Sequence, residues 1–313
     1  PLVIALVWAG PWPFAALLGL CAVLGGWELA GLLRRLGFVA PPVLPLLALV
    51  VFGISLAGWL GQAALPLTLL AWTVPLLWLL RRASRRLVFD FADAVFCNTD
   101  GTPSRTRMAR FAAMARACDH VLAGNAFLAA RAAAFNPAVT VVPTGVDAAR
   151  YRVAANRPSD SFDLVWIGSH ATRKYLAEAM PWLQEAAKAV PGLRLKIVAD
   201  FDLPACGVAT LPVAWQADSE ARELAASHIG IAPMRDDDWS RGKCALKVLQ
   251  YMAAGLPVVS SKAGANAEVI SEDETGFLVS TPEAWAECIV RLANDADLRR
   301  RMGEAGRRLV ETD

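Results

Sequence analysis

The sequence predicts amino-terminal transmembrane helices followed by an α/β domain with a parallel sheet. The first observation is the distribution of charge along the 313 residues. Of the 31 Lys and Arg and the 29 Asp and Glu, only Glu28, Arg34 and Arg35 lie before residue 81. The second is that short apolar runs alternate with amphipathic runs from residue 162 onward. The hydrophobic share of 56% therefore averages a membrane region and a soluble one.

Three apolar stretches approach the roughly 20 residues that span a bilayer, namely residues 14–33, 43–60 and 65–80. A fourth, residues 2–9, resembles the tail of a span. Arginines follow the first and the last full stretch, at Arg34, Arg35, Arg81, Arg82, Arg85 and Arg86. The positive-inside rule places them in the cytoplasm. We therefore expect an inner or plasma membrane protein with a lipid bilayer as a partner and a cytosolic soluble part; a plain membrane anchor is the simplest role for the first 80 residues.

The soluble part predicts alternating strands and helices. Strands are expected at residues 162–167, 193–199, 208–215, 228–232, 256–260 and 276–279. Helices are expected at residues 174–190, 219–226, 244–254, 282–292 and 296–310, the first of them bent or divided at Pro181. This alternation is typical of a parallel sheet with helices on both faces and a ligand crevice at the carboxyl ends of the strands.

A shorter module precedes this one. It has a helical run at 105–117 between apolar segments at 87–96 and 120–124, and it ends in the strand-like run VTVVPTGVD. The polar stretch 154–161 has the composition of a linker. The expected domains are a transmembrane region at 1–86, a partial Rossmann-like domain at 87–150 and a ligand-binding Rossmann-like domain at 151–313.

Composition excludes several classes of function. The net charge of +2 indicates no nucleic-acid partner, because acidic residues nearly balance basic ones. The six cysteines form no CxxC pair and have no histidine at metal spacing, so neither a zinc site nor a disulfide framework is indicated. The run Asp236-Asp237-Asp238 offers a formal Asp-x-Asp metal motif, but a solvated loop is the preferred interpretation, and no metal or other cofactor is expected.

The first candidate ligand site is the turn between the strand at 162–167 and the following helix. Small residues at Gly168 and Ser169 let backbone N–H groups approach an anion, and the helix N-terminus favours negative charge. Arg173 or Lys174 could neutralise a diphosphate, and His170 is the histidine nearest this turn. An ordinary strand-to-helix turn with solvated basic residues remains the alternative.

The second candidate site is the segment 240–259, where a loop containing Gly242 and Lys243 opens a helix. Lys247 and Gln250 are three residues apart and hence share one helix face. Taken on spacing alone, these two side chains could instead decorate the solvent side of an amphipathic helix.

The motifs in this region point to a family. The run Gly242-Lys243-Cys244, the segment KVLQYMAAG, the following PVV and the later ETGFLV together resemble the donor-binding half of family 4 glycosyltransferases, which have the two-domain GT-B architecture. Supporting matches lie at 142–147 and 165–169. The resemblance covers about residues 87–313 and implies a GT-B-like Rossmann donor domain.

The resemblance implies a nucleotide diphosphate sugar as the donor, transfer without a metal, and in general retention of configuration. Lys174 matches the residue that contacts the diphosphate, and Ser169 stands where many members have Arg. The family's Glu-seven residues-Glu motif would fall at Gly242 and Gln250, so both carboxylates are absent. We hypothesise that Lys243 and Lys247 take over part of the donor contact and that backbone around Gly264, Ala265 and Asn266 approaches the sugar.

The amino-terminal half departs from the family. The segment that resembles its acceptor-binding domain starts only near residue 87, so about half of that domain is missing, and no catalytic residue is assigned. Asp90 and Asp93 match an acidic pair whose role is open. Trp27 and Glu28 stand at the end of a span, and residues 1–80 thereby weakly resemble the amino-terminal membrane region of phosphatidate cytidylyltransferases. The expected acceptor is a glycan, polysaccharide or lipid; the alternatives are an inactive nucleotide-sugar-binding module and a gene fusion.

Overall fold

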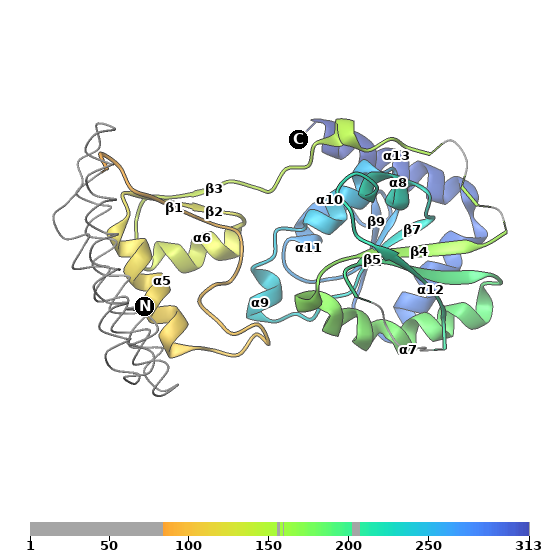
Figure 1. The fold of residues 1–313 in the computed structure, drawn as a ribbon, viewed down its shortest axis with the longest axis horizontal. Coiled ribbons are helices and arrows are strands. Elements are labelled where there is room, and N and C mark those ends of the chain that lie inside the picture. The colour runs from red at the N-terminus through yellow and green to blue at the C-terminus, as the bar shows by residue number, and fades with distance from the viewer. Residues whose placement is uncertain (1–83, 155–156, 159, 202–206, 313) are drawn as a thin grey trace, which may run out of the picture. The chain divides into compact units, whose positions relative to one another are not determined.

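The computed structural model describes residues 84–154, 157–158, 160–201 and 207–312 (Figure 1). The membrane spans expected before residue 81 lie outside the described residues. Among the helices that are described, none combines the length and the apolarity needed to cross a bilayer. The described chain divides into two compact units, one holding residues 84–89 and 109–119 and the other the rest.

The smaller unit is held by paired backbone and ring contacts. The Leu87 N–H donates to Asp119 Oδ2 at 2.8 Å, and the Asp119 N–H donates back to the Leu87 carbonyl at 2.8 Å. The rings of Phe89 and Phe111 lie 5.9 Å apart between centroids. This unit contains most of α5 (Arg105–Ala117), a helix whose bounds agree with the sequence prediction.

A three-stranded sheet has the order β1 (Val88–Phe91), β2 (His120–Ala123) and β3 (Val139–Val141). β2 and β3 pair in parallel. Helix α6 (Ala126–Ala133) connects them, and the Asn125 side chain caps it by accepting from the Leu128 N–H at 2.9 Å. A short 3₁₀ turn, η2 (Ala148–Arg150), follows β3.

The larger sheet has six parallel strands, as the alternating pattern predicts. They are β4 (Phe162–Ile167), β5 (Leu193–Ala199), β6 (Ala209–Ala214), β7 (Ile229–Ala232), β8 (Val258–Ser261) and β9 (Gly276–Val279). Their order is β6-β5-β4-β7-β8-β9. The order reverses at β4, which lies between β5 and β7. Ligands of such sheets bind beyond the carboxyl ends of the strands at this reversal.

The helices follow the predicted positions to within a few residues. They are η3 (His170–Thr172), α7 (Arg173–Ala189), α8 (Glu220–Ala225), α9 (Asp238–Arg241), α10 (Leu246–Ala253), α11 (Asn266–Val269), α12 (Pro282–Asn294) and α13 (Ala296–Thr312). Of the two expected effects of Pro181, bending or division, division does not occur, because α7 continues through this residue. The sequence did not predict α9 and α11, because four residues carry too little periodicity.

Alternate side chains of β4 enter two cores. Leu164 and Trp166 pack with α7 and α12 on one face, whereas Val165 and Ile167 pack with α8 and α10 on the other. Figure 1 shows these helix pairs on opposite faces of the sheet. Every residue of β4 is buried, as expected for a central parallel strand. The end of this strand is therefore a rigid base for the turn that follows it.

Helix α13 contacts the carboxyl end of α10 through a glycine. A Cβ added at Gly303 would lie 2.2 Å from the Gly255 carbonyl oxygen and 2.9 Å from its carbon. Helix propensity alone would make alanine about 1 kcal/mol better than glycine at this position. We expect the clash to outweigh this gain, because both atoms belong to backbone.

Gly303→Ala should lower the free energy of unfolding by about 1–3 kcal/mol, which is typical of overpacking. Urea denaturation followed by tryptophan fluorescence measures this change. Gly145→Ala is the matched control, because a Cβ there meets no atom within 4 Å, and its change should stay within about 0.5 kcal/mol. A Gly303→Ala protein at least as stable as the parent would contradict the close approach of α13.

Candidate nucleotide-sugar site

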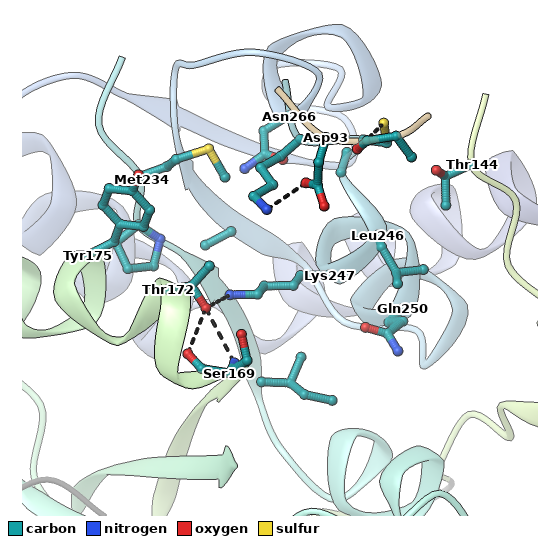
Figure 2. A pocket seen from close by; sticks show the side chains of 18 of the residues that line it. Asp93, Thr144, Ser169, Thr172, Tyr175, Met234, Leu246, Lys247, Gln250 and Asn266 are labelled. Carbon is teal, nitrogen blue, oxygen red and sulfur yellow. Dashed lines mark hydrogen bonds and ion pairs between the residues drawn. The ribbon is translucent and has the colours of Figure 1, made fainter. Parts of the chain in front are cut away.

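A cavity of about 610 Å³ opens at the carboxyl ends of β4 and β7, within the larger unit. Ile167 and Gly168 line it from the end of β4, and Ala232 and Pro233 from the end of β7. The cavity therefore lies at the point where the strand order reverses. Figure 2 shows polar side chains from the turn after β4 and from α10 directed into it.

Lys247 reaches from α10 to the turn after β4. Its Nζ donates to Thr172 Oγ1 at 3.1 Å and lies 4.4 Å from the centroid of the Trp166 ring. A Cβ added at Gly168 would lie 2.8 Å from this nitrogen. Because glycine has no Cβ, the ammonium group of Lys247 can lie directly against the turn at Gly168.

Within the described ranges, no carboxylate pairs with Lys247. None of the ion pairs found among the described residues includes it. Burial and the neighbouring charge of Lys243 lower the pKa of Lys247 to about 7. An ammonium group that borders a cavity and lacks a counter-charge is suited to hold an anionic ligand.

Hydroxyl groups fix the turn that faces Lys247. The Ser169 N–H donates to Thr172 Oγ1 at 3.3 Å, and the Thr172 hydroxyl lies 3.2 Å from the Ser169 carbonyl (Figure 2). One residue before the turn, the Ile167 N–H donates to the Tyr251 hydroxyl at 2.9 Å, and this hydroxyl donates to the Ile231 carbonyl at 3.2 Å. Tyr251 thereby joins α10 to the ends of β4 and β7.

A second lysine lines the cavity but has a partner. Lys243 Nζ pairs with Asp93 Oδ1 at 2.6 Å and lies 4.3 Å from the centroid of the Trp239 ring. Its neighbour Gly242 makes room for the segment that carries Asp93, because a Cβ there would lie 2.7 Å from the Ala94 nitrogen. Lys243 therefore adds positive charge that is already partly balanced.

Six of the residues assigned to donor binding from the sequence line this cavity, namely Gly168, Ser169, Lys243, Lys247, Gln250 and Asn266. Asn266 is 3% exposed and donates from Nδ2 to Ser260 Oγ at 2.9 Å. The alternative in which Lys247 and Gln250 decorate the solvent side of the helix differs from the structure, in which both side chains border the cavity. Their contact with a donor stays a prediction.

Five assigned residues do not line the cavity. His170 stacks edge-on against Phe201 with centroids 5.2 Å apart, and the Arg173 guanidinium lies 5.6 Å from the same ring. Lys174 Nζ donates to the Thr99 carbonyl. Gly242 and Gly264 contribute backbone outside the lining, Gly264 with φ of +50°.

Trp215 and Glu220 are among the cavity residues that the sequence did not single out. Glu220 is 8% exposed and is the first residue of α8. Acidic residues are common at helix starts, so only its place after a strand at the carboxyl edge of the sheet could have pointed to a ligand.

The three consecutive aspartates have separate protein partners. Asp236 pairs with Arg241 at 2.7 Å, Asp237 caps α9 by accepting from the Ser240 N–H at 2.7 Å, and Asp238 pairs with Arg131 at 3.0 Å. In the part of the chain that is described, no three His, Cys, Asp or Glu side chains are grouped to hold a metal ion. Metal-independent chemistry stays a prediction.

Comparison with known families identifies the domain that carries this cavity. Residues 161–295 match the family model described as glycosyl transferases group 1. The match covers β4 to α12, the part of the larger sheet that carries most of the cavity lining. The resemblance inferred from the Gly-Lys-Cys and KVLQYMAAG motifs is thereby confirmed. The cytidylyltransferase resemblance of residues 1–80 finds no support in these comparisons.

Two curated relatives match short segments of the chain. Spore coat protein SA of Bacillus subtilis (strain 168) is 38% identical over 67 residues, which are 20% of this chain and 18% of that protein. D-inositol 3-phosphate glycosyltransferase of Corynebacterium glutamicum (strain R) is 38% identical over 61 residues, or 19% and 15%. The chain thus matches less than a fifth of the length of either relative.

Similarity to solved structures covers more of the chain. The structure of Anabaena Alr3699/HepE in complex with UDP-glucose has a TM-score of 0.62 at 17% identity and covers 88% of this chain and 80% of that one. At this identity the likeness concerns the fold alone. The expected α/β fold with GT-B-like Rossmann domains is confirmed for the α/β part, whereas the domain boundaries near 86 and 150 stay predictions.

Tyr251→Phe should lower the free energy of unfolding of the protein by about 1–3 kcal/mol. The change leaves the Ile167 N–H without its acceptor in a fully buried position. Urea denaturation monitored by tryptophan fluorescence measures it, and the dependence of the free energy on urea concentration should stay unchanged. A loss below about 0.5 kcal/mol would contradict a structural role for this hydroxyl.

Proposed function

We propose that this chain transfers a sugar from a nucleotide diphosphate sugar to an acceptor, with retention of configuration. The observation that carries the proposal is Lys247, a cation without a carboxylate partner that faces the turn after β4 in a group 1 glycosyltransferase domain. The turn at Gly168 and Ser169 lines the same cavity at the carboxyl end of β4.

The chemistry requires stabilisation of the leaving group. As the glycosidic bond breaks, negative charge grows on the departing nucleoside diphosphate. Lys247 and Lys243 provide positive charge on its side of the cavity, and a low local dielectric strengthens their effect. No step in this scheme needs a metal ion.

UDP-glucose is the first donor to test. The solved structure of Anabaena Alr3699/HepE, which shares the fold, contains UDP-glucose. This supports a uridine nucleotide as the donor in the present chain. The affinity for UDP-glucose is compared with the affinities for a panel of other UDP-, GDP- and dTDP-sugars.

The proposed acceptor is a glycan, polysaccharide or lipid at the cytosolic face of an inner or plasma membrane. Support comes from the nearly uncharged residues 1–80 and the arginines that follow them. An inactive nucleotide-sugar-binding module is the second candidate, since Gly242 and Gln250 occupy the positions of the two family carboxylates.

Calorimetry with the donor panel, combined with an assay for donor hydrolysis or transfer, tests the proposal on the full chain in detergent. Lys247→Met should weaken donor binding roughly 10- to 100-fold, because a hydrogen bond to a charged group is worth about 1.5–3 kcal/mol. Lys188→Met is the matched control, since Lys188 is exposed and pairs with Glu185. Binding without hydrolysis or transfer would favour the inactive module, and no binding of any donor would overturn both.

The lowered pKa of Lys247 makes donor binding depend on pH. Below pH 7 the free protein carries a charged Lys247, and this charge is lost as the pH rises through 7. An anionic ligand binds the charged form better, so the dissociation constant for UDP-glucose should rise about tenfold from pH 6 to pH 8.

Lys247→Arg serves as the control for this dependence, because a guanidinium stays charged throughout the range. Its dissociation constant should change less than about twofold between the same pH values. Equal slopes in the parent and in Lys247→Arg would show that another group titrates.

A further inference from the structure

We infer that Glu220, rather than the residue at position 250, accepts a hydrogen bond from a ribose hydroxyl of the nucleotide. The cavity would then select ribonucleoside diphosphates over their deoxy forms. This inference rests on the proposed function and deepens it, since it assigns the nucleoside end of the same site.

Three neutral donors surround the Glu220 carboxylate. Oε1 accepts from the Tyr151 hydroxyl at 2.7 Å and from Gln250 Nε2 at 2.8 Å. Oε2 accepts from Trp215 Nε1 at 2.7 Å. A carboxylate offers about four acceptor positions, so Oε2 retains one position, and Glu220 lines the cavity.

The negative charge of Glu220 has no cationic partner among the ion pairs of the described residues. A buried carboxylate held only by neutral groups is costly. Burial and the bond to Glu220 raise the pKa of Tyr151 to about 12, so its phenol remains a donor. The remaining acceptor position is thus a fixed, strongly polar feature of the cavity wall.

Gln250 positions Glu220 instead of replacing it. Its Nε2 donates to Glu220 Oε1 and also lies 3.2 Å from the Tyr151 hydroxyl. A glutamate at position 250 would bring a second carboxylate to the same distance, and two like charges so close cannot both ionise at low cost. Glutamine at 250 and glutamate at 220 therefore form a matched pair.

The surroundings of Glu220 suit a nucleoside. Trp215 is 50% exposed and Leu246 is 47% exposed, and both line the cavity. A large flat apolar surface next to a hydroxyl acceptor matches a base attached to a ribose. On α10, Gln250 follows Lys247 by one helical turn, about 5–6 Å between their Cβ atoms. The diphosphate of a nucleotide could therefore lie at Lys247 while its ribose lies near Gln250 and Glu220.

The test compares the binding of UDP and GDP with that of their 2′-deoxy and 3′-deoxy forms to the full chain in detergent. The parent protein should bind UDP or GDP at least about tenfold more tightly than one of its deoxy forms, as expected for one hydrogen bond to a charged group. Glu220→Gln should reduce this preference to within about twofold. Glu287→Gln, an exposed glutamate on α12, should leave it unchanged.

The outcomes separate this inference from the proposed function. If the parent binds UDP or GDP but binds both deoxy forms equally well, or if the preference survives in Glu220→Gln, Glu220 does not contact ribose and the proposed function stands. If neither nucleotide binds, the inference fails, and if no sugar nucleotide of the donor panel binds either, the proposed function fails with it. If Glu220→Gln loses its cooperative unfolding transition, Glu220→Asp replaces it in the test. This variant keeps the carboxylate but moves it away from the cavity, because the side chain is one methylene shorter. A preference for the ribonucleotide that survives in Glu220→Asp would equally overturn the inference.

Discussion

The candidate site depends on one hydroxyl group, that of Tyr251, which joins a helix to the ends of two strands. It accepts from the Ile167 N–H and donates to the Ile231 carbonyl, so that α10, β4 and β7 meet at a single atom. Gly230 makes the approach possible, because a Cβ there would lie 2.3 Å from the Tyr251 ring. Since Lys247 and Gln250 belong to the same helix, this contact sets where both side chains meet the cavity. The polar lining thus follows from a packing constraint in the core.

Charge is left unbalanced at two places along the cavity, and the two do not cancel each other. Lys247 is held by a hydroxyl and an aromatic ring, whereas Glu220 is held by a phenol, an amide and an indole. Neutral partners orient each group without neutralising it. Under the proposals made above, a nucleotide sugar would meet the cation with its diphosphate and the anion with a ribose hydroxyl. Such a ligand would supply the anion that Lys247 lacks and the hydrogen-bond donor that Glu220 lacks.

The sequence predicts the sheet well and the site in part. Buried strands such as Phe162–Ile167 have unbroken apolar runs with clear ends, so their bounds agree with the structure. The shared face of Lys247 and Gln250 follows from helical spacing alone. His170 and Arg173 were assigned to the donor because they are polar and near the turn, yet both pack on Phe201, a partner distant in sequence. Glu220 was missed because its three donors come from three separate segments.

The absence of a carboxylate at position 250 is weak evidence for an inactive protein. Replacing glutamate by glutamine removes a charge, but here the amide lies 2.8 Å from a second carboxylate on the neighbouring helix α8. The cavity therefore keeps one negative charge near the end of α10, and only its origin in the chain differs. Under the inference above, Glu220 takes the role that the family assigns to position 250, and Gln250 orients it. Under the proposed function, activity then depends on how the site stabilises the leaving diphosphate, and the cation placed to do so is Lys247.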